Sequence, residues 1–282
     1  MTTPLLTVDL DPADPDVSSV HHATLASLPR HFRVAAGGPA DVAMISGRSG
    51  DWPAAVTAAI DAGRRAIVLT RPAPVALADV VAAADLAAQA DAIVAVETSY
   101  AGHRTWAEVR RQFGADAADA SLLDSVLSTP AAGGGLYAVL LDQLAVVRPL
   151  LDRALSLEVV HRSDDHYVLH STAGEPVVNL VGLLSPGVAA SLQVDLVSPE
   201  RHWRVRFGPP DEAAPIDVER HDAGGTTSWL PTYQTSCRQL WVDLHATLTG
   251  APALRHTLAE LAGDAAVADE LLGQATRALR TR

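Results

Sequence analysis

The chain has 282 residues, of which 48% are hydrophobic, and its formal net charge is −12. That length suits two domains, and the acidic balance argues against nucleic acid and anionic membranes as partners. Cys237 is the single cysteine, which excludes an internal disulfide and a zinc site built from several cysteines; with no apolar run of membrane-spanning length and no signal-peptide pattern, the expected location is cytoplasmic.

The first predicted strand–turn–helix unit lacks the turn that holds a dinucleotide cofactor. Leu5–Leu10 is predicted as a buried strand and Ser18–Leu28 as a helix, but the turn at 11–16 reads Asp-Pro-Ala-Asp-Pro-Asp instead of G-x-G-x-x-G. Prolines lack an N–H, and carboxylates repel a pyrophosphate. A simpler interpretation is that Asp16 or Ser18 caps the helix and the aspartates are solvated. Both interpretations exclude an ordinary cofactor turn. The helix positions expected to pack are Val20, Ala23, Leu25 and Leu28.

Alternating apolar runs and alanine-rich stretches predict βα units and a parallel sheet up to residue 130. Only 37–41 separate the predicted strands Phe32–Ala36 and Val42–Ser46, whereas a βαβ unit needs roughly 30 residues, so at least one crossover is missing. The remaining predicted elements here are helices Trp52–Ala62 and Val75–Ala90 and strands Ala66–Leu69 and Ala92–Glu97.

A second pattern follows the glycines at 133–135. A helix with an apolar stripe comes first, then strands without intervening helices, which is typical of an antiparallel sheet. We therefore expect an α/β protein with a truncated Rossmann-like domain at 1–130 and an α+β domain with an open, mainly antiparallel sheet at 131–282. The stripe is Leu136, Leu140, Gln143, Val147 and Leu150; the strands are Leu157–His161, Tyr167–His170, Val177–Leu184, Ala189–Leu196, Trp203–Phe207 and Ile216–Glu219; the last helices are Gln234–Leu248 and Ala253–Arg280.

Several segments together resemble the Gfo/Idh/MocA oxidoreductases. The run from Asp41 to Pro72 and the triple glycine before an amphipathic helix are similar to that superfamily. The segments 99–106, 136–144 and 202–210, with Ser228-Trp229, resemble the thiazolinyl imine reductases of siderophore assembly lines. This resemblance implies a Rossmann domain, an open sheet that serves as an oligomer interface, and a role in natural-product biosynthesis.

The chain departs from the superfamily at the residues that move protons. Thr70-Arg71-Pro72 stands where the superfamily usually has Glu-Lys-Pro, and arginine keeps the charge but cannot act as a general acid. The Asp and His that many members carry on the helix after the glycines fall on Val139 and Gln143, neither of which titrates.

Ligands of open α/β sheets bind at the carboxyl ends of the strands. Three strand ends deliver polar residues there, and we expect Tyr100, His103 and Arg71 to be catalytic and Arg48 and Trp52 to bind substrate. Tyr100 could donate a proton or a hydrogen bond, and His103 could act as a base. The alternatives are surface ion pairs for the two arginines and a helix start on a solvated face for His103.

Two residues of the second domain complete the expected substrate site. Gln143 and Trp229 are assigned to it, with a core amide and a sheet-packing indole as their respective alternatives. The histidines are scattered without a ligand motif, so no metal site is expected. Cys237 lies beside Arg238, which could lower its pKa, although a buried inert thiol is the commoner case.

Three functions stay open. The leading hypothesis is a non-redox enzyme or binding protein, without a cofactor, that acts on a small or carrier-tethered heterocyclic intermediate and partners an assembly-line protein. The second is an NAD(P)H-dependent imine reductase, with NADP as the alternative cofactor, that binds the cofactor phosphates through Arg33, Arg48, Arg64 and Arg65. The third is a catalytically dead partner subunit, and a homodimer through the C-terminal sheet is expected.

Overall fold

The computed structural model describes residues 5–36, 40–130, 135–151, 155–171, 174, 176–251, 254 and 256–273. The chain forms two compact units, Met1–Thr98 with Ser236–Ala266 and Ser99–Thr235 with Val267–Arg282. This division differs from the boundary at residue 130 expected from the sequence, because the segment 99–130 contributes a helix and a central strand to the second unit. Among the described helices, none is both long and apolar enough to cross a membrane.

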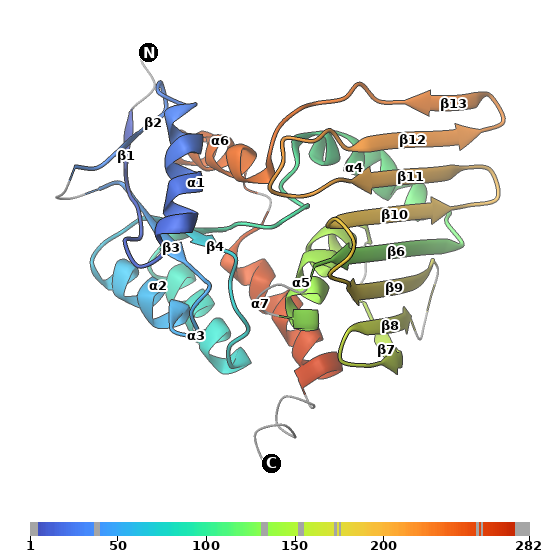
Figure 1. Cartoon of the computed structure of the whole chain (residues 1–282), viewed down its shortest axis with the longest axis horizontal. Helices are drawn as coiled ribbons and strands as arrows, with labels where there is room; N and C mark the ends of the chain where they lie inside the picture. The colour runs from blue at the N-terminus through green and yellow to red at the C-terminus, as the bar shows by residue number, and fades with distance from the viewer. Residues whose placement is uncertain are drawn as a thin grey trace. The chain divides into compact units, whose positions relative to one another are not determined.

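The first unit is built on a five-stranded parallel sheet in the order β2-β1-β3-β4-β5 (Figure 1). Every residue of β4 is buried, as expected for a parallel strand that is covered on both faces. The predicted parallel sheet is therefore confirmed. The strands are β1 Leu6–Asp9, β2 Phe32–Val34, β3 Val42–Ser46, β4 Ala66–Thr70 and β5 Ile93–Val96.

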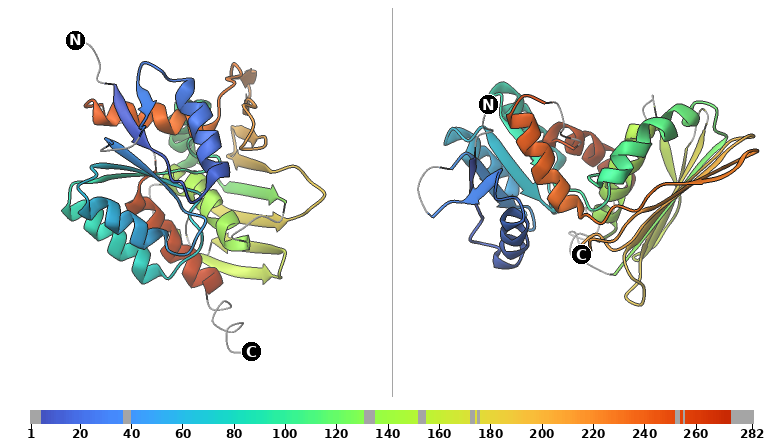
Figure 2. Two further views of the ribbon diagram at one scale, coloured as in Figure 1. Left: turned by 60° about the vertical axis from the view of Figure 1, so that its left-hand side comes forward. Right: turned by 90° about the horizontal axis from the view of Figure 1, so that it is seen from above.

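Helices cover both faces of this sheet (Figure 2). Val42 and Met44 of β3 share a core with α1 and α6, and the alternation of side chains along a strand directs Ile45 to the opposite face, where α2 packs on β3 and β4 and against α3. The helices are α1 Pro15–Ala26, α2 Trp52–Asp61, α3 Leu77–Gln89, α6 Ser236–Leu248 and most of α7 Leu258–Ala268. The end of α7 from Val267 and the π-helical turn at Asp269–Gly273 belong to the second unit.

The missing crossover is confirmed between β2 and β3. The dinucleotide-binding order is 3-2-1-4-5-6, and here β2 is the edge strand of the described sheet, so the strand that would lie outside it is absent from that sheet. Both ends of the short connection bind β1: Ala35 N donates to Val8 O at 2.8 Å and Asp41 N donates to Thr7 O at 2.9 Å. The chain therefore passes directly from one side of β1 to the other.

The buried face of α1 differs from the predicted one. Val20 is 52% exposed and Ala23 is also exposed, so the predicted packing of these two residues is wrong. The stripe that packs on the sheet is Val17, His21 and Leu25, spaced four residues apart. The stripe does not follow from the pattern of apolar residues, because its middle residue is a histidine.

The second unit is an eight-stranded sheet in the order β13-β12-β11-β10-β6-β9-β8-β7. All neighbours are antiparallel except β6 and β9, which confirms the mainly antiparallel sheet. Helices α4 (Arg104–Ala117) and α5 (Gly135–Val147, continued by a 3-10 turn at Arg148–Leu150) supply core residues against one face. The strands are β6 Leu122–Thr129, β7 Leu157–Arg162, β8 His166–Ser171, β9 Val177–Leu184, β10 Ser191–Val197, β11 His202–Phe207, β12 Asp217–Asp222 and β13 Gly225–Ser228, of which β6 and β13 were not predicted.

Candidate functional site

The topological switch point of the parallel sheet lies between β1 and β3, and the chain's own aspartates fill it. Asp14 is the N-cap of α1: one carboxylate oxygen accepts from Val17 N at 3.1 Å and the other accepts from Ser46 Oγ at 2.8 Å. Asp11 Oδ2 accepts from Ser46 N, at the end of β3, at 2.9 Å. The cap is thus Asp14, not Asp16 or Ser18; the Ser18 hydroxyl instead donates to Asp11 O at 2.5 Å.

The charge of this turn opposes a phosphate. Burial raises the pKa of Asp14, but the hydrogen bonds from Ser46 and Val17 and the charge of Arg48 outweigh it, and the pKa is lowered. The carboxylate therefore stays ionised at neutral pH, at the helix N-terminus where a pyrophosphate would be bound. Arg48 Nε lies 3.6 Å from Asp14 Oδ2, so its charge is already paired within the chain.

The other arginines considered for phosphate binding lie elsewhere in the unit. Arg33 is within β2, and Arg64 and Arg65 precede β4, at the amino end of that strand. Arg64 donates a hydrogen bond to Ala40 O and lies 3.9 Å from Asp9 Oδ2. Of the four, only Arg48 follows the carboxyl end of its strand.

The turns after β3 and β4 are tied together around Arg71. Gly47 N donates to Thr70 O at 2.6 Å, and Ala73 N donates to Gly47 O at 2.6 Å. A Cβ at Gly47 would lie 2.5 Å from Thr70 O, so this close approach requires glycine. Arg71 itself has φ +44°, the left-handed region that non-glycine residues rarely adopt and that is common at functional sites.

Trp52 has a packing role in the described geometry. Its side chain is 1% exposed, and Nε1 donates to Ala73 O at 3.0 Å. The indole supports the turn that carries Arg71 and presents little surface to a ligand. This geometry favours a structural role over the substrate-binding role expected from the sequence.

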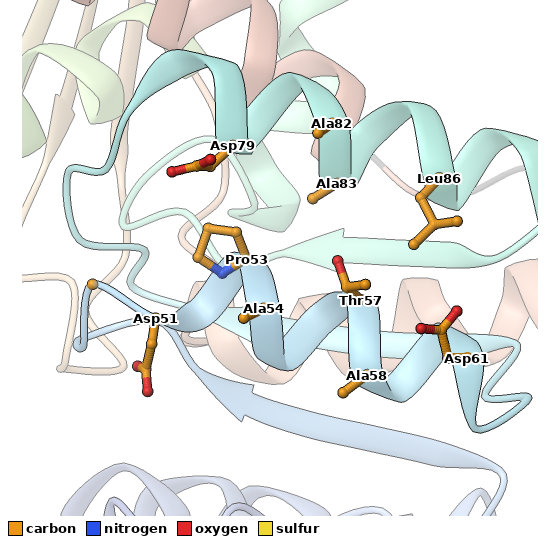
Figure 3. Close-up of a pocket in the computed structure, with 11 residues that line it drawn as sticks. Asp51, Pro53, Ala54, Thr57, Ala58, Asp61, Asp79, Ala82, Ala83 and Leu86 are labelled. Atoms are coloured by element: carbon orange, nitrogen blue, oxygen red, sulfur yellow. The ribbon is translucent and has the colours of Figure 1, made fainter.

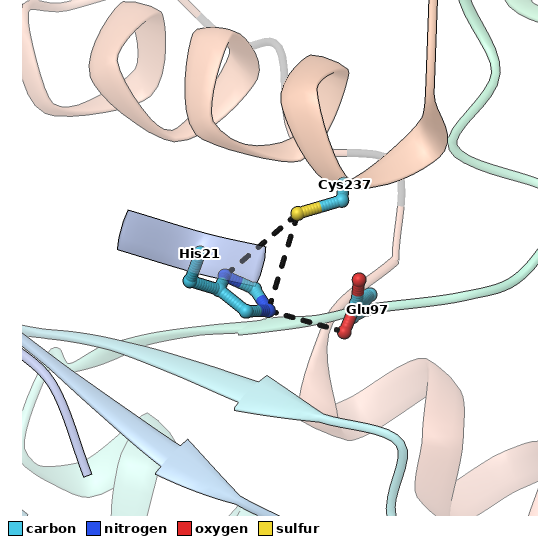
Figure 4. Close-up of side chains that lie close together, drawn as sticks. All are labelled: His21, Glu97 and Cys237. Atoms are coloured by element: carbon cyan, nitrogen blue, oxygen red, sulfur yellow. Dashed lines mark hydrogen bonds and ion pairs between the residues drawn. The ribbon is translucent and has the colours of Figure 1, made fainter. Parts of the chain in front are cut away.

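A buried polar cluster in the first unit joins α1, the end of β5 and α6 (Figure 4). His21 Nε2 lies 3.5 Å from Glu97 Oε2, and Cys237 Sγ lies 3.8 Å from His21 Nδ1 and 3.9 Å from Nε2. Trp241 Nε1 donates to His21 Nδ1 at 3.0 Å. Sequence reasoning missed His21 and Glu97; the one available signal was a histidine in an otherwise apolar helical stripe.

Burial and neighbouring charges shift the pKa values of Glu97 and Cys237 in opposite directions. Burial raises the pKa of Glu97, but the imidazole of His21 and the charge of Arg71 outweigh it, and the pKa is lowered. Burial and the charge of Glu97 raise the pKa of Cys237. Arg238 is not among the groups that shift the pKa of this thiol, and its Nε donates to Ser27 Oγ at 3.3 Å. The predicted alternative of a lowered thiol pKa is therefore wrong.

Tyr100 and His103 lie in one turn of the second unit, where His103 N donates to Tyr100 O at 3.1 Å. Tyr100 is 3% exposed, and burial together with the charge of Asp142 raises its pKa. Its hydroxyl therefore keeps its proton at neutral pH and is able to donate a hydrogen bond. Asp142, which sequence reasoning missed, accepts from Ser99 N at 3.0 Å and Ser99 Oγ at 2.7 Å.

His103 begins α4 as its N-cap. Nδ1 accepts from Thr105 N at 3.3 Å, and the ring is buried. The expected helix start is confirmed, but the imidazole is not part of the solvated face formed by Arg104 and Glu108, which pair at 2.8 Å. Arg71 belongs to the first unit and His103 to the second.

Gln143 and Trp229 have packing partners in the second unit. Gln143 is fully buried; its Nε2 donates to Ser125 O at 2.9 Å and Val181 O at 3.1 Å, and its Oε1 accepts from Tyr167 OH at 2.6 Å. The half-buried Trp229 ring lies 5.0 Å from that of Trp203. Both geometries favour the structural alternatives.

An open groove of about 640 Å³ lies between α2 and α3 (Figure 3). Its lining includes three carboxylates and no basic residue, namely Gly50, Asp51, Pro53, Ala54, Thr57, Ala58, Asp61, Asp79, Ala82, Ala83 and Leu86. Such a lining repels phosphates and carboxylates. The groove is therefore unsuited to bind the cofactor phosphates in place of the switch point.

Solved structures with the same fold are oxidoreductases by name. UDP-N-acetylglucosamine 3-dehydrogenase from Acidithiobacillus ferrooxidans matches with a TM-score of 0.73 and 12% identity over 95% of this chain and 97% of that one. An oxidoreductase from Sinorhizobium meliloti matches with 0.76 and 11% identity over 97% and 98%. An oxidoreductase from Agrobacterium radiobacter, in complex with NAD+, L-tartaric acid and magnesium, matches with 0.70 and 11% identity over 96% of each chain. These likenesses show that the chain shares its fold with named oxidoreductases. No protein-family model and no curated protein matches the sequence.

Proposed function

We propose that the chain has lost ordinary nicotinamide binding and acts as a non-redox enzyme or binding protein in natural-product biosynthesis of the nonribosomal peptide or siderophore type. Its ligand is a small or carrier-tethered heterocyclic intermediate. One observation carries the loss of the cofactor. Asp11 accepts a hydrogen bond from Ser46 N and Asp14 accepts one from Ser46 Oγ, and Asp14 also caps the helix end that would bind a pyrophosphate.

The proposed functional residues are Arg71 in the first unit and, considered separately, Tyr100 and His103 in the second. Arg71 provides a permanent positive charge on a turn fixed by hydrogen bonds, which suits an anionic or electron-rich group. Tyr100 provides a hydroxyl that stays protonated, and His103 an imidazole in the same turn. These groups suit ligand binding and acid–base chemistry.

The alternative is an NAD(P)H-dependent thiazolinyl imine reductase with an unusual cofactor mode. It is favoured by the fold, which is shared with a named dehydrogenase and with a named oxidoreductase in complex with NAD+. In this chain such a mode needs phosphate donors other than the N-terminus of α1, and Arg48 would have to leave Asp14.

Calorimetric titration with NADPH, NADH and their oxidised forms tests the proposal, with an intact dehydrogenase of this fold as the positive control. We expect no heat of binding up to millimolar cofactor. Micromolar binding would overturn the proposal and make reduction the leading function. A second titration uses a carrier protein loaded with a thiazoline-bearing thioester; Tyr100→Phe and Arg71→Ala should weaken its binding, and unchanged binding in both variants would show that the site is placed wrongly.

We also propose that the second unit mediates a homodimer through its sheet. No described helix of this unit covers the face opposite α4 and α5, and Val126 in the central strand β6 is 38% exposed. Light scattering should give twice the chain mass for the wild type and a monomer for Val126→Arg. Val188→Arg is the control, because Val188 is equally exposed, at 41%, but lies in a loop. A monomeric wild type at micromolar concentration would contradict the proposal.

A further inference from the structure

The cluster of His21, Glu97 and Cys237 joins three different ligand types in one buried place (Figure 4). An imidazole, a carboxylate and a thiol come from α1, the end of β5 and α6, and one ligand atom of each lies within 4.8 Å of the others. His21 is 1% and Cys237 8% exposed. Glu97 is 11% exposed in its side chain, so the cluster differs from the exposed acidic groups that often gather without an ion.

The separations within the cluster leave room for a metal ion. His21 Nε2 is 3.5 Å from Glu97 Oε2, longer than a usual N–H···O bond of about 2.9 Å, and its 3.9 Å contact with Cys237 Sγ is at the long end for a sulfur hydrogen bond. Around a tetrahedral ion with bonds of about 2.0–2.3 Å, neighbouring ligand atoms are roughly 3.3–3.6 Å apart. Glu97 Oε2 is buried and makes no hydrogen bond within the described part of the chain. The three atoms lie within 4.8 Å of one another, so a pair at that limit would have to approach by about 1.3 Å to bind one ion.

We propose that His21 Nε2, Glu97 Oε2 and Cys237 Sγ bind one zinc-like divalent transition-metal ion inside the first unit. Thiolate, imidazole and carboxylate together are the ligand types of Zn2+ and Co2+, whereas Mg2+ and Ca2+ prefer oxygen. Three protein ligands leave one tetrahedral position for water or another donor. The ion would join α1, β5 and α6, which are far apart in sequence.

The hydrogen bond from Trp241 to His21 lowers the affinity of this site for a metal ion. An indole N–H can only donate, so its bond to His21 Nδ1 makes Nδ1 the acceptor and places the proton of a neutral ring on Nε2. When an ion binds Nε2, that proton moves to Nδ1, the bond to Trp241 breaks, and the thiol releases its proton to solvent. Trp241 therefore weakens metal binding, and its removal should strengthen it.

Cobalt titration of the chelator-treated full-length protein tests the proposal. Cys237 is the only cysteine, so a thiolate-to-cobalt absorption band can arise only from this site. We expect the band to saturate at one equivalent of Co2+ and to be displaced by Zn2+. Cys237→Ser should abolish it, and His21→Gln or Glu97→Gln should weaken binding at least about tenfold.

Two matched variants separate this site from adventitious binding. Trp241→Phe keeps an aromatic ring against Phe32 but removes the indole N–H, and should tighten binding roughly fivefold, the equivalent of one hydrogen bond. His166→Gln, on the second unit, should leave the titration unchanged. No thiolate band up to millimolar Co2+ in the folded protein, or a band unaffected by both His21→Gln and Glu97→Gln, would overturn the proposal. Circular dichroism verifies that each variant is folded.

Discussion

Replacing Gly182 by alanine is expected to destabilise the second unit by about 3 kcal/mol. Gly182 lies in β9, directly opposite Tyr167 of β8. The Tyr167 ring crosses the glycine, and an added Cβ would lie within 2.5 Å of three of its side-chain atoms. The ring is fully buried and held by its bond to Gln143, so it has no room to move away. Urea unfolding followed by tryptophan fluorescence measures the loss as a lower midpoint.

A matched glycine in the same unit provides the control. A Cβ at Gly187 would have nothing within 4 Å, so Gly187→Ala should leave the midpoint unchanged or raise it slightly. Adding Tyr167→Leu to Gly182→Ala should recover part of the loss, because the smaller side chain makes room for the methyl group. A wild-type midpoint for Gly182→Ala would show that the ring does not lie over the glycine.

Gln143→Met is expected to cost about 2–3 kcal/mol of unfolding free energy. Methionine keeps the approximate volume but leaves the Tyr167 hydroxyl without its acceptor and removes the donor to Ser125 O and Val181 O. A buried polar group that loses its partner pays the full desolvation cost. The Gln143 amide links α5 to β6, β8 and β9. Chemical denaturation measures the change in unfolding free energy.

A double-mutant cycle distinguishes this structural role from the substrate-binding role expected from the sequence. Tyr167→Phe alone should cost about 1 kcal/mol, and Gln143→Met with Tyr167→Phe should cost less than the sum of the single changes, because both partners are then removed. If Gln143→Met unfolds like the wild type but loses binding of the carrier-tethered ligand, Gln143 is a ligand residue and the core interpretation is wrong.

Most strands could be predicted because buried strands consist of short runs of apolar residues. Val42–Ser46 and Val177–Leu184 coincide with β3 and β9. β6 was missed, since Asp124, Ser125 and Ser128 interrupt the apolar run of Leu122–Thr129 and no turn signal marks its start. The predicted boundary between the units at residue 130 differs from the observed one for the same reason. β6 pairs with β9 and β10, so β6 and the segment before it belong to the second unit.

The candidate site was harder to predict than the fold. Arg71 and Tyr100 could be chosen because both follow predicted strands. His21, Glu97 and Cys237 could not, because their meeting depends on how α1 and α6 pack on the sheet, across more than two hundred residues of sequence. Trp52 and Gln143 had the right chemistry for ligands, but their burial and partners are decided by packing.

The sequence by itself determined the alternation of strands and helices, the lost glycine turn and the shortened connection after β2, because each depends on neighbouring residues and on local backbone chemistry. Only the tertiary structure decided that Asp11 and Asp14 bind Ser46, that a histidine of α1 meets a thiol of α6, and that Gly182 makes room for Tyr167. Those outcomes rest on contacts between distant segments, which packing of the folded chain selects and no local pattern encodes.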